Sequence, residues 1–190
     1  MKKRVVVLVL AAVLVFGCAI GGTLAWLQDK TDTVTNVFTY GNVDIDLTEN
    51  EGTVNAEGNR EFKMIPGSTI DKDPKITVDT DSEYAYIFVE ITKSENYSDF
   101  LEEYAIADGW TALAGADGVY YREYNSESGN EFYVLKNNQV KVSDDVTKGD
   151  IEGIGTDYPT LSFTAYAVQM ENVETVADAW AIAKPAQQGN

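Results

Sequence analysis

The chain has 190 residues, of which 31 are acidic and 14 basic, giving a formal net charge of −17, with no histidine and one cysteine. The lack of histidine excludes Ser-His-Asp and Cys-His nucleophilic catalysis and any His-based zinc site. The negative charge argues against nucleic acid as a partner, because nucleic acid is itself a polyanion. We expect a protein that binds or polymerises, carries no obligatory cofactor and is not an enzyme.

The N-terminus has the pattern of a secretory signal. Three basic residues at positions 2–4 precede an uninterrupted apolar run from Val5 to Phe16, and the first acidic residue is Asp29. A basic region followed by an apolar region of this length is typical of exported chains. Residues 1–25 are therefore interpreted as a signal peptide.

Cleavage is predicted between Ala25 and Trp26. The glycine pair at 21–22 would end the apolar helix, and Thr23 and Ala25 supply small residues at positions −3 and −1 of the cleavage site. A mature chain that starts at Trp26 keeps 31 acidic but only 11 basic residues, a formal charge of −20.

Two alternatives keep this segment at the membrane. The uncharged stretch Val5–Leu27 has the roughly 20 residues needed to span a bilayer, so an uncleaved chain would carry a single N-terminal anchor. Cys18 follows a stretch that loosely resembles a lipidation motif, although the bulky Phe16 and the apolar residues after the cysteine disfavour this interpretation. In each case the membrane is a partner only through the N-terminal segment.

After the leader, the apolar pattern changes to the alternation of β-strands. One face of a first strand is formed by Val34, Asn36, Phe38 and Tyr40. In a second strand Val43, Ile45 and Leu47 alternate with Asp44 and Asp46. Both patterns are typical of half-buried strands.

The middle of the chain contains the strongest strand signal. Residues 49–59 predict a solvated loop, Pro66-Gly67 a tight turn, and Lys75–Val78 a strand. Tyr84–Thr92 is apolar on both faces, which is typical of a central strand.

The second half predicts a short helix, a strand meander, a closing strand and a last helix, at 97–104, 110–142, 160–171 and 173–183 respectively. The fold class is mainly β, a jelly-roll-like antiparallel β-sandwich with one or two short helices, preceded by the N-terminal signal helix. We expect one domain over residues 26–184 and a disordered tail at 185–190.

Calcium is the one inorganic partner that the composition favours, because it prefers hard oxygen ligands. Two sets of acidic residues could converge in loops: Asp71, Asp73, Asp79, Asp81 and Glu83, and separately Asp144, Asp145 and Asp150. Neither set has the spacing of an EF-hand, so solvated loops are the simpler interpretation. Likewise, four tyrosines could form a binding face or simply pair across a sheet: Tyr120, Tyr121, Tyr124 and Tyr133.

Five stretches of the chain share a likeness with one group of exported proteins: Gly21–Leu27, Asp32–Thr39, Gly41–Leu47, Met64–Pro74 and Leu161–Gln169. Together they resemble the TasA/camelysin family of Gram-positive bacteria. Residues 95–158 carry no specific likeness. The resemblance implies processing by a SipW-type signal peptidase and a jelly-roll domain. It also implies assembly into biofilm matrix fibres, in which the N-terminal segment of one subunit joins the sheet of the next. The metalloprotease label of camelysins is not carried over, because no zinc-binding histidine exists.

The sequence therefore predicts a secreted cell-surface or matrix structural protein that associates with itself or with other matrix proteins. Residues 26–40 are the candidate donor strand, with Val34, Asn36, Phe38 and Tyr40 as its inward face. The first alternative is a monomeric surface-binding or adhesion module, and the second is a carboxylate-based hydrolase.

Overall fold

The computed structural model describes residues 43–56 and 58–184, and every structural statement below concerns these residues. They belong to the unit formed by residues 34–190. The predicted cleavage site at Ala25 and Trp26, the donor-strand residues Val34, Asn36, Phe38 and Tyr40, and the tail at 185–190 lie outside the described part.

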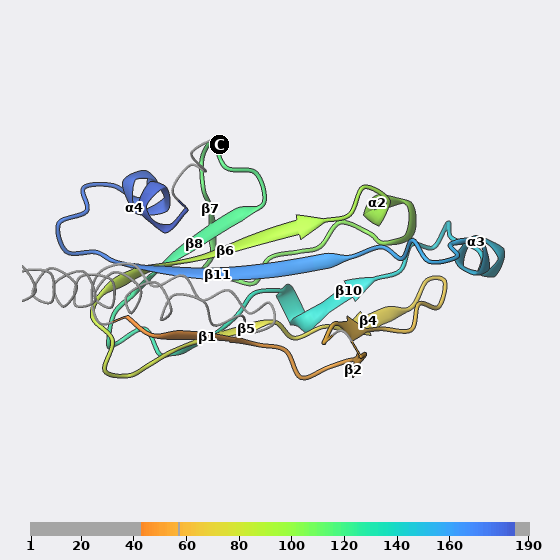
Figure 1. The fold of residues 1–190 in the computed structure, drawn as a ribbon, viewed down its shortest axis with the longest axis horizontal. Helices are drawn as coiled ribbons and strands as arrows, with labels where there is room; N and C mark the ends of the chain where they lie inside the picture. The colour runs from red at the N-terminus through yellow and green to blue at the C-terminus, as the bar shows by residue number, and fades with distance from the viewer. Residues whose placement is uncertain (1–42, 57, 185–190) are drawn as a thin grey trace, which may run out of the picture. The chain divides into compact units, whose positions relative to one another are not determined.

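Two antiparallel sheets form the two main layers of this unit (Figure 1). The larger sheet has the strand order β11 (Leu161–Gln169), β6 (Ala85–Lys93), β8 (Val119–Tyr124) and β7 (Thr111–Ala112). The smaller sheet has the order β1 (Ile45–Thr48), β5 (Lys75–Val78) and β9 (Glu131–Tyr133). The predicted mainly-β antiparallel class is confirmed.

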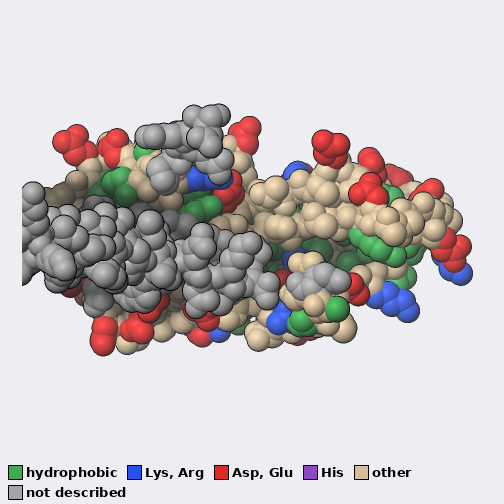
Figure 2. Space-filling model, viewed as in Figure 1, with side chains coloured by type: hydrophobic (Ala, Val, Ile, Leu, Met, Phe, Trp, Pro, Cys, Tyr) green, Lys and Arg blue, Asp and Glu red, His purple; other side chains and the backbone are tan. Residues whose placement is uncertain are grey.

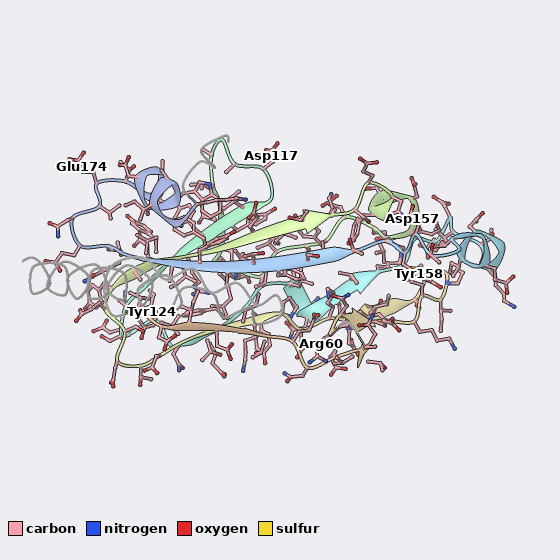
Figure 3. All side chains as sticks on the ribbon, in the orientation of Figure 1. Arg60, Asp117, Tyr124, Asp157, Tyr158 and Glu174 are labelled. Carbon is pink, nitrogen blue, oxygen red and sulfur yellow. The ribbon has the colours of Figure 1, made fainter. Side chains whose placement is uncertain are left out.

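The main core fills the space between these sheets. Ile76 and Val78 of β5 face Ile87 and Val89 of β6, and all four are completely buried. Tyr124 of β8 also points between the sheets, as Figure 3 shows, and its ring meets that of Phe132 edge to face. This central packing explains why β6 is apolar on its inner face.

The outer face of β6 is buried as well, by the C-terminal helix α4 (Val176–Ala183). Phe88 of β6 and Tyr166 of β11 lie 5.3 and 5.2 Å from the ring of Trp180, centroid to centroid. Thr175 caps the helix by accepting a hydrogen bond from the Asp178 N–H. The prediction that β6 is a central strand with two apolar faces is confirmed.

Two small antiparallel pairs complete the strands. They are β10 (Gln139–Lys141) with β4 (Thr69–Asp71), and β2 (Thr53–Val54) with β3 (Arg60–Glu61). The turn before β4 is the one predicted at Pro66-Gly67: Gly67 has φ +70° and the Ser68 N–H bonds the Ile65 carbonyl. The remaining short helical elements are α2 (Tyr97–Phe100), η1 (Lys136–Asn138) and α3 (Lys148–Gly153).

Three local predictions need correction. The helix predicted over 97–104 ends at Phe100, because Leu101 turns to extended backbone and forms a β-bridge with Val142. The loop predicted over 49–59 contains strand β2. Helix α3 was not predicted, although Thr147 and Asp150 form a capping box at its start.

Phe88→Ala should remove the contact that joins the larger sheet to α4. Loss of a fully buried phenylalanine costs about 3–5 kcal/mol in the free energy of unfolding, because a cavity remains where the ring was. Urea unfolding followed by circular dichroism measures this loss. Thr92→Ala, at an exposed position of the same strand, is the matched control and should have a far smaller effect. Equal losses in the two variants would contradict the packing described for Phe88.

Stability should fall as pH rises through the tyrosine range. Burial, together with the negative charge of Glu103, raises the pKa of Tyr97 from 10.0 to about 12, and burial with the hydrogen bond to Glu90 raises the pKa of Tyr166 to about 12. Since the folded pKa exceeds the unfolded one, this contribution is complete below pH 10 and is lost as pH approaches 12. Urea unfolding between pH 9 and 12 should show the decline, and Tyr97→Phe should make it shallower. An identical slope in that variant would contradict the prediction.

Candidate functional site

Among the described strands, β11 is the edge strand of the larger sheet. Half of its main-chain N–H and C=O groups point away from β6. The Ser94 N–H bonds the Thr160 carbonyl at 3.1 Å, and the Met170 N–H bonds the Tyr84 carbonyl at 2.8 Å. Because hydrogen-bonded pairs alternate in an antiparallel ladder, the even-numbered residues of β11 bond to β6. The main-chain groups of Leu161, Phe163 and Ala165 therefore point to the other side of the strand.

Among the described strands, β1 is likewise an edge strand of the smaller sheet. The Asp79 N–H bonds the Asp44 carbonyl at 2.9 Å, so Asp46 and Thr48 bond toward β5, whereas Ile45 and Leu47 direct their main-chain groups outward. Residues of β1 and β11 approach within 8 Å, Cα to Cα. The two edge strands therefore lie on one lateral side of the sandwich, one in each layer (Figure 1).

The opposite lateral side is closed by other parts of the chain. The Trp110 indole N–H bonds the Tyr133 carbonyl of β9 at 2.9 Å, and just beyond β9 Leu135 forms a bridge with Ile106. Strand β7 has only two residues. Short or covered edges of this kind have few main-chain groups free to pair with another strand. Strand β11, by contrast, has nine residues and therefore a long edge.

An ion pair fixes one end of the β1 and β11 side. Lys72, with a side chain only 9% exposed, donates to Glu49, which directly follows β1, at 2.8 Å between Nζ and Oε1. The same ammonium group lies 5.3 Å from the ring centroid of Phe163 in β11 and 4.6 Å from that of Phe62. Lys72 therefore links the end of β1 to β11. It was not predicted, because its partners lie far away in the sequence.

The five calcium candidates are not gathered into one site. Asp71 accepts a hydrogen bond from Gln139, and Asp79 accepts one from the Asp81 N–H in a turn. Asp81 and Glu83 are exposed. Within the described ranges, no three side chains among Asp, Glu, His and Cys are close enough to hold an ion.

Asp73 has a structural contact of its own. It accepts hydrogen bonds from the backbone N–H groups of Asn50 and Glu51 at 2.9 and 3.0 Å. Burial alone would raise the pKa of Asp73, but these bonds outweigh it and lower the pKa below its ordinary value. This carboxylate anchors the loop after β1.

The second acidic set is also engaged in local contacts. Asp144 pairs with Lys141 at 2.6 Å, and Asp150 accepts hydrogen bonds from the hydroxyl and the N–H of Thr147 in the capping box of α3. Asp145 uses its own N–H to bond the Ser143 hydroxyl. These contacts serve turns and a helix start, and calcium binding remains a prediction.

The four tyrosines pack mainly across the sheets and form no common face. Tyr124 is 3% exposed in the main core, and Tyr121 meets Tyr86 edge to face on the outer side. Tyr120 packs against the main core, while Tyr133 is exposed on β9. The cross-strand interpretation of these residues is the one that fits the contacts.

One hollow bears on the predicted hydrolase. It has a volume of about 340 Å³ and is lined by Glu83, Tyr84, Gln169, Met170 and Glu171, where β6 begins and β11 ends. Glu83 and Glu171 both line it beside the exposed Tyr84, and Glu171 accepts a hydrogen bond from the Gln169 side chain at 3.4 Å. The carboxylate mechanism stays a prediction.

Among the described helices, none combines the length and apolar character needed to cross a bilayer.

Comparison with known proteins identifies the family of the chain. The sequence model of a family described as camelysin metallo-endopeptidase matches residues 1–105. The chain belongs to the TasA/camelysin family. No curated protein and no solved structure matches it.

The family description mentions a metal, but the donor set of this chain does not fit one. The chain has no histidine, and its only cysteine, Cys18, lies in the apolar N-terminal stretch. Catalytic zinc sites use three protein ligands drawn from His, Glu, Asp and Cys, and the described ranges hold no such group. These residues do not form the zinc centre of a metallo-endopeptidase.

Lys72→Met should destabilise the protein by about 3–5 kcal/mol, because it leaves Glu49 desolvated without a partner. The double variant Lys72→Met, Glu49→Leu should recover most of this loss, since no buried charge then remains. Urea unfolding of the single and double variants measures both effects. Lys148→Met, which breaks the exposed pair with Glu152, is the matched control and should change stability little. A double variant no more stable than the single one would contradict this account.

Proposed function

We propose that this protein is a secreted structural subunit of the cell surface or extracellular matrix. It assembles into fibres when residues 26–40 of one copy pair with the β11 edge of the next, on the side shared with β1. The observation that carries the proposal is the pair of edge strands, β1 and β11, on one side of the described sandwich. Membership of the TasA/camelysin family supports the same function.

The physical basis of this assembly is strand addition. An added strand would bond the outward N–H and C=O groups of Leu161, Phe163 and Ala165, and such main-chain bonds need no specific side chain. The alternation of Val34, Phe38 and Tyr40 in the donor segment would supply apolar side chains to the partly buried Leu47, Leu161 and Phe163.

Export and assembly would be coupled by cleavage. A SipW-type signal peptidase that cuts before Trp26 would release the end that pairs with a neighbour. The charge of −20 on the cleaved chain would oppose close approach of copies, and acidic side chains are indeed spread over the face seen in Figure 2. Assembly should therefore strengthen as salt or divalent cations screen this repulsion.

Removing residues 26–40 should abolish fibres and leave a folded monomer. The chain starting at Trp26 and the chain starting at Gly41 are compared by negative-stain electron microscopy, size exclusion and circular dichroism, with and without calcium. Fibres only from the longer chain, with similar spectra for both, are the expected result. If the shorter chain unfolds instead, the segment closes its own sheet, and a monomeric surface-binding module becomes the better function.

A variant of the edge itself provides the control for that comparison. Ala165→Pro removes an N–H that points away from β6, so it should block an added strand while the β6 ladder keeps its bonds. If this variant does not fold, Gln169→Pro tests the same edge at the end of the strand. Fibres of normal length from a folded edge variant would argue against pairing at β11.

A further inference from the structure

Among the described cations, Arg122 is the one that is half-buried without a polar partner. Six lysines each pair with a carboxylate: Lys72, Lys75, Lys93, Lys141, Lys148 and Lys184. Arg60 donates to two backbone carbonyls, and Lys63 and Lys136 are exposed to water. In the described part of the chain, Arg122 alone is half-buried with neither an ion pair nor a hydrogen bond, and its Nε is buried without an acceptor.

Aromatic rings hold this guanidinium group in a fixed orientation. Its Cζ lies 3.7 Å from the ring centroid of Phe132 and 5.5 Å from that of Trp110. Trp110 is itself fixed by its bond to the Tyr133 carbonyl. Cation–π contacts stabilise the charge through its flat faces, but the N–H groups in the plane still need acceptors.

Gly109 lies beside the terminal nitrogens of Arg122. Gly109 has φ +89°, and a Cβ placed there would lie 3.4 Å from Nη2 and 3.5 Å from Nη1. Any other residue would be strained by that φ, and its Cβ would be in van der Waals contact with these nitrogens. Burial also lowers the pKa of Arg122, so its charge is partly desolvated, and no described carboxylate pairs with it.

We propose that Arg122, framed by Phe132, Trp110 and Gly109, is a binding site for a carboxylate group. The guanidinium fork matches two carboxylate oxygens, and one negative charge would neutralise the unpaired positive charge of Arg122. The site lies where β8 and β9 face each other beneath the 105–110 segment, on the side opposite β1 and β11. It is thus separate from the edge proposed for strand addition and does not depend on that function.

The carboxylate can come from a small acid in solution or from an acidic side chain of a second copy. The chemistry is the same in both cases, and the second copy offers 31 acidic residues. In a chain with so large an excess of acid, a partly desolvated arginine is the one described position where a neighbour's carboxylate would find an unpaired cation in a low-dielectric setting.

The test uses nuclear magnetic resonance on the full chain, solubilised in a mild non-ionic detergent. The protein has three arginines, Arg4, Arg60 and Arg122, so their Nε–H signals are easily separated, and Arg122→Lys identifies the third. Sodium acetate is titrated against sodium chloride at equal ionic strength. The proposal predicts a saturable shift of the Arg122 signal in acetate that chloride does not reproduce, with Arg60 as the internal control.

A second measurement distinguishes the two sources of the carboxylate. Sedimentation velocity compares the unchanged chain with Arg122→Lys and Arg122→Met, each checked for folding by circular dichroism. Weaker self-association in both variants, and in the unchanged chain when acetate is added, assigns the carboxylate to a neighbouring copy. Association that is unchanged, together with a saturable acetate shift, assigns it to a free acid.

The proposal fails if the Arg122 signal responds alike to acetate and chloride and if folded Arg122 variants associate as the unchanged chain does. The role of Arg122 would then be structural: its aliphatic carbons and its contacts with Phe132 and Trp110 would pack this side of the sandwich.

Discussion

The antiparallel ladder between β6 and β11 is the interaction on which the rest of the fold depends. Nine consecutive residue pairs join the two strands, from Leu161 with Lys93 to Gln169 with Ala85. One face of this ribbon supplies Ile87 and Ala165 to the core between the sheets, and the other supplies Phe88 and Tyr166 to the contact with α4. The ladder holds β11 on one side, and its other side pairs with no described strand; that long edge is the basis of the proposed assembly.

Elements with a local signal could be predicted from the sequence. The strands β6 and β11 were predicted because their alternation runs over many residues, and the turn at Pro66-Gly67 because glycine alone accepts its φ without strain. The helix predicted from Tyr97 onward was too long because a bridge between Leu101 and Val142 outcompeted the helical pattern. That bridge joins residues far apart in the chain, so no local sequence pattern could predict it.

The two charged residues with the most buried contacts, Lys72 and Arg122, could not be predicted from the sequence. Lys72 finds Glu49 across 23 positions of sequence, and Arg122 lies between rings that come from β9 and from the segment before β7. Both look like ordinary surface cations in the sequence. Conversely, the acidic residues that looked like a calcium site serve separate turns and loops. Net charge therefore did not predict the location of any site.

The central claim is that the N-terminal segment of one copy pairs with the β11 edge of another, and disulfide trapping tests it most directly. A chain that starts at Trp26 has no cysteine, so Asn36→Cys, on the predicted inward face of the donor segment, and Leu161→Cys, on the inward face of β11, can be made in separate chains and mixed under oxidising conditions. Neighbouring positions on paired strands are close enough for a disulfide, and cysteines at 34, 38 and 40 cover other registers. The account predicts cross-linked dimers that contain one chain of each kind. A third chain carries both cysteines. If the mixture gives no such dimers and this third chain forms the disulfide within itself, the account is contradicted.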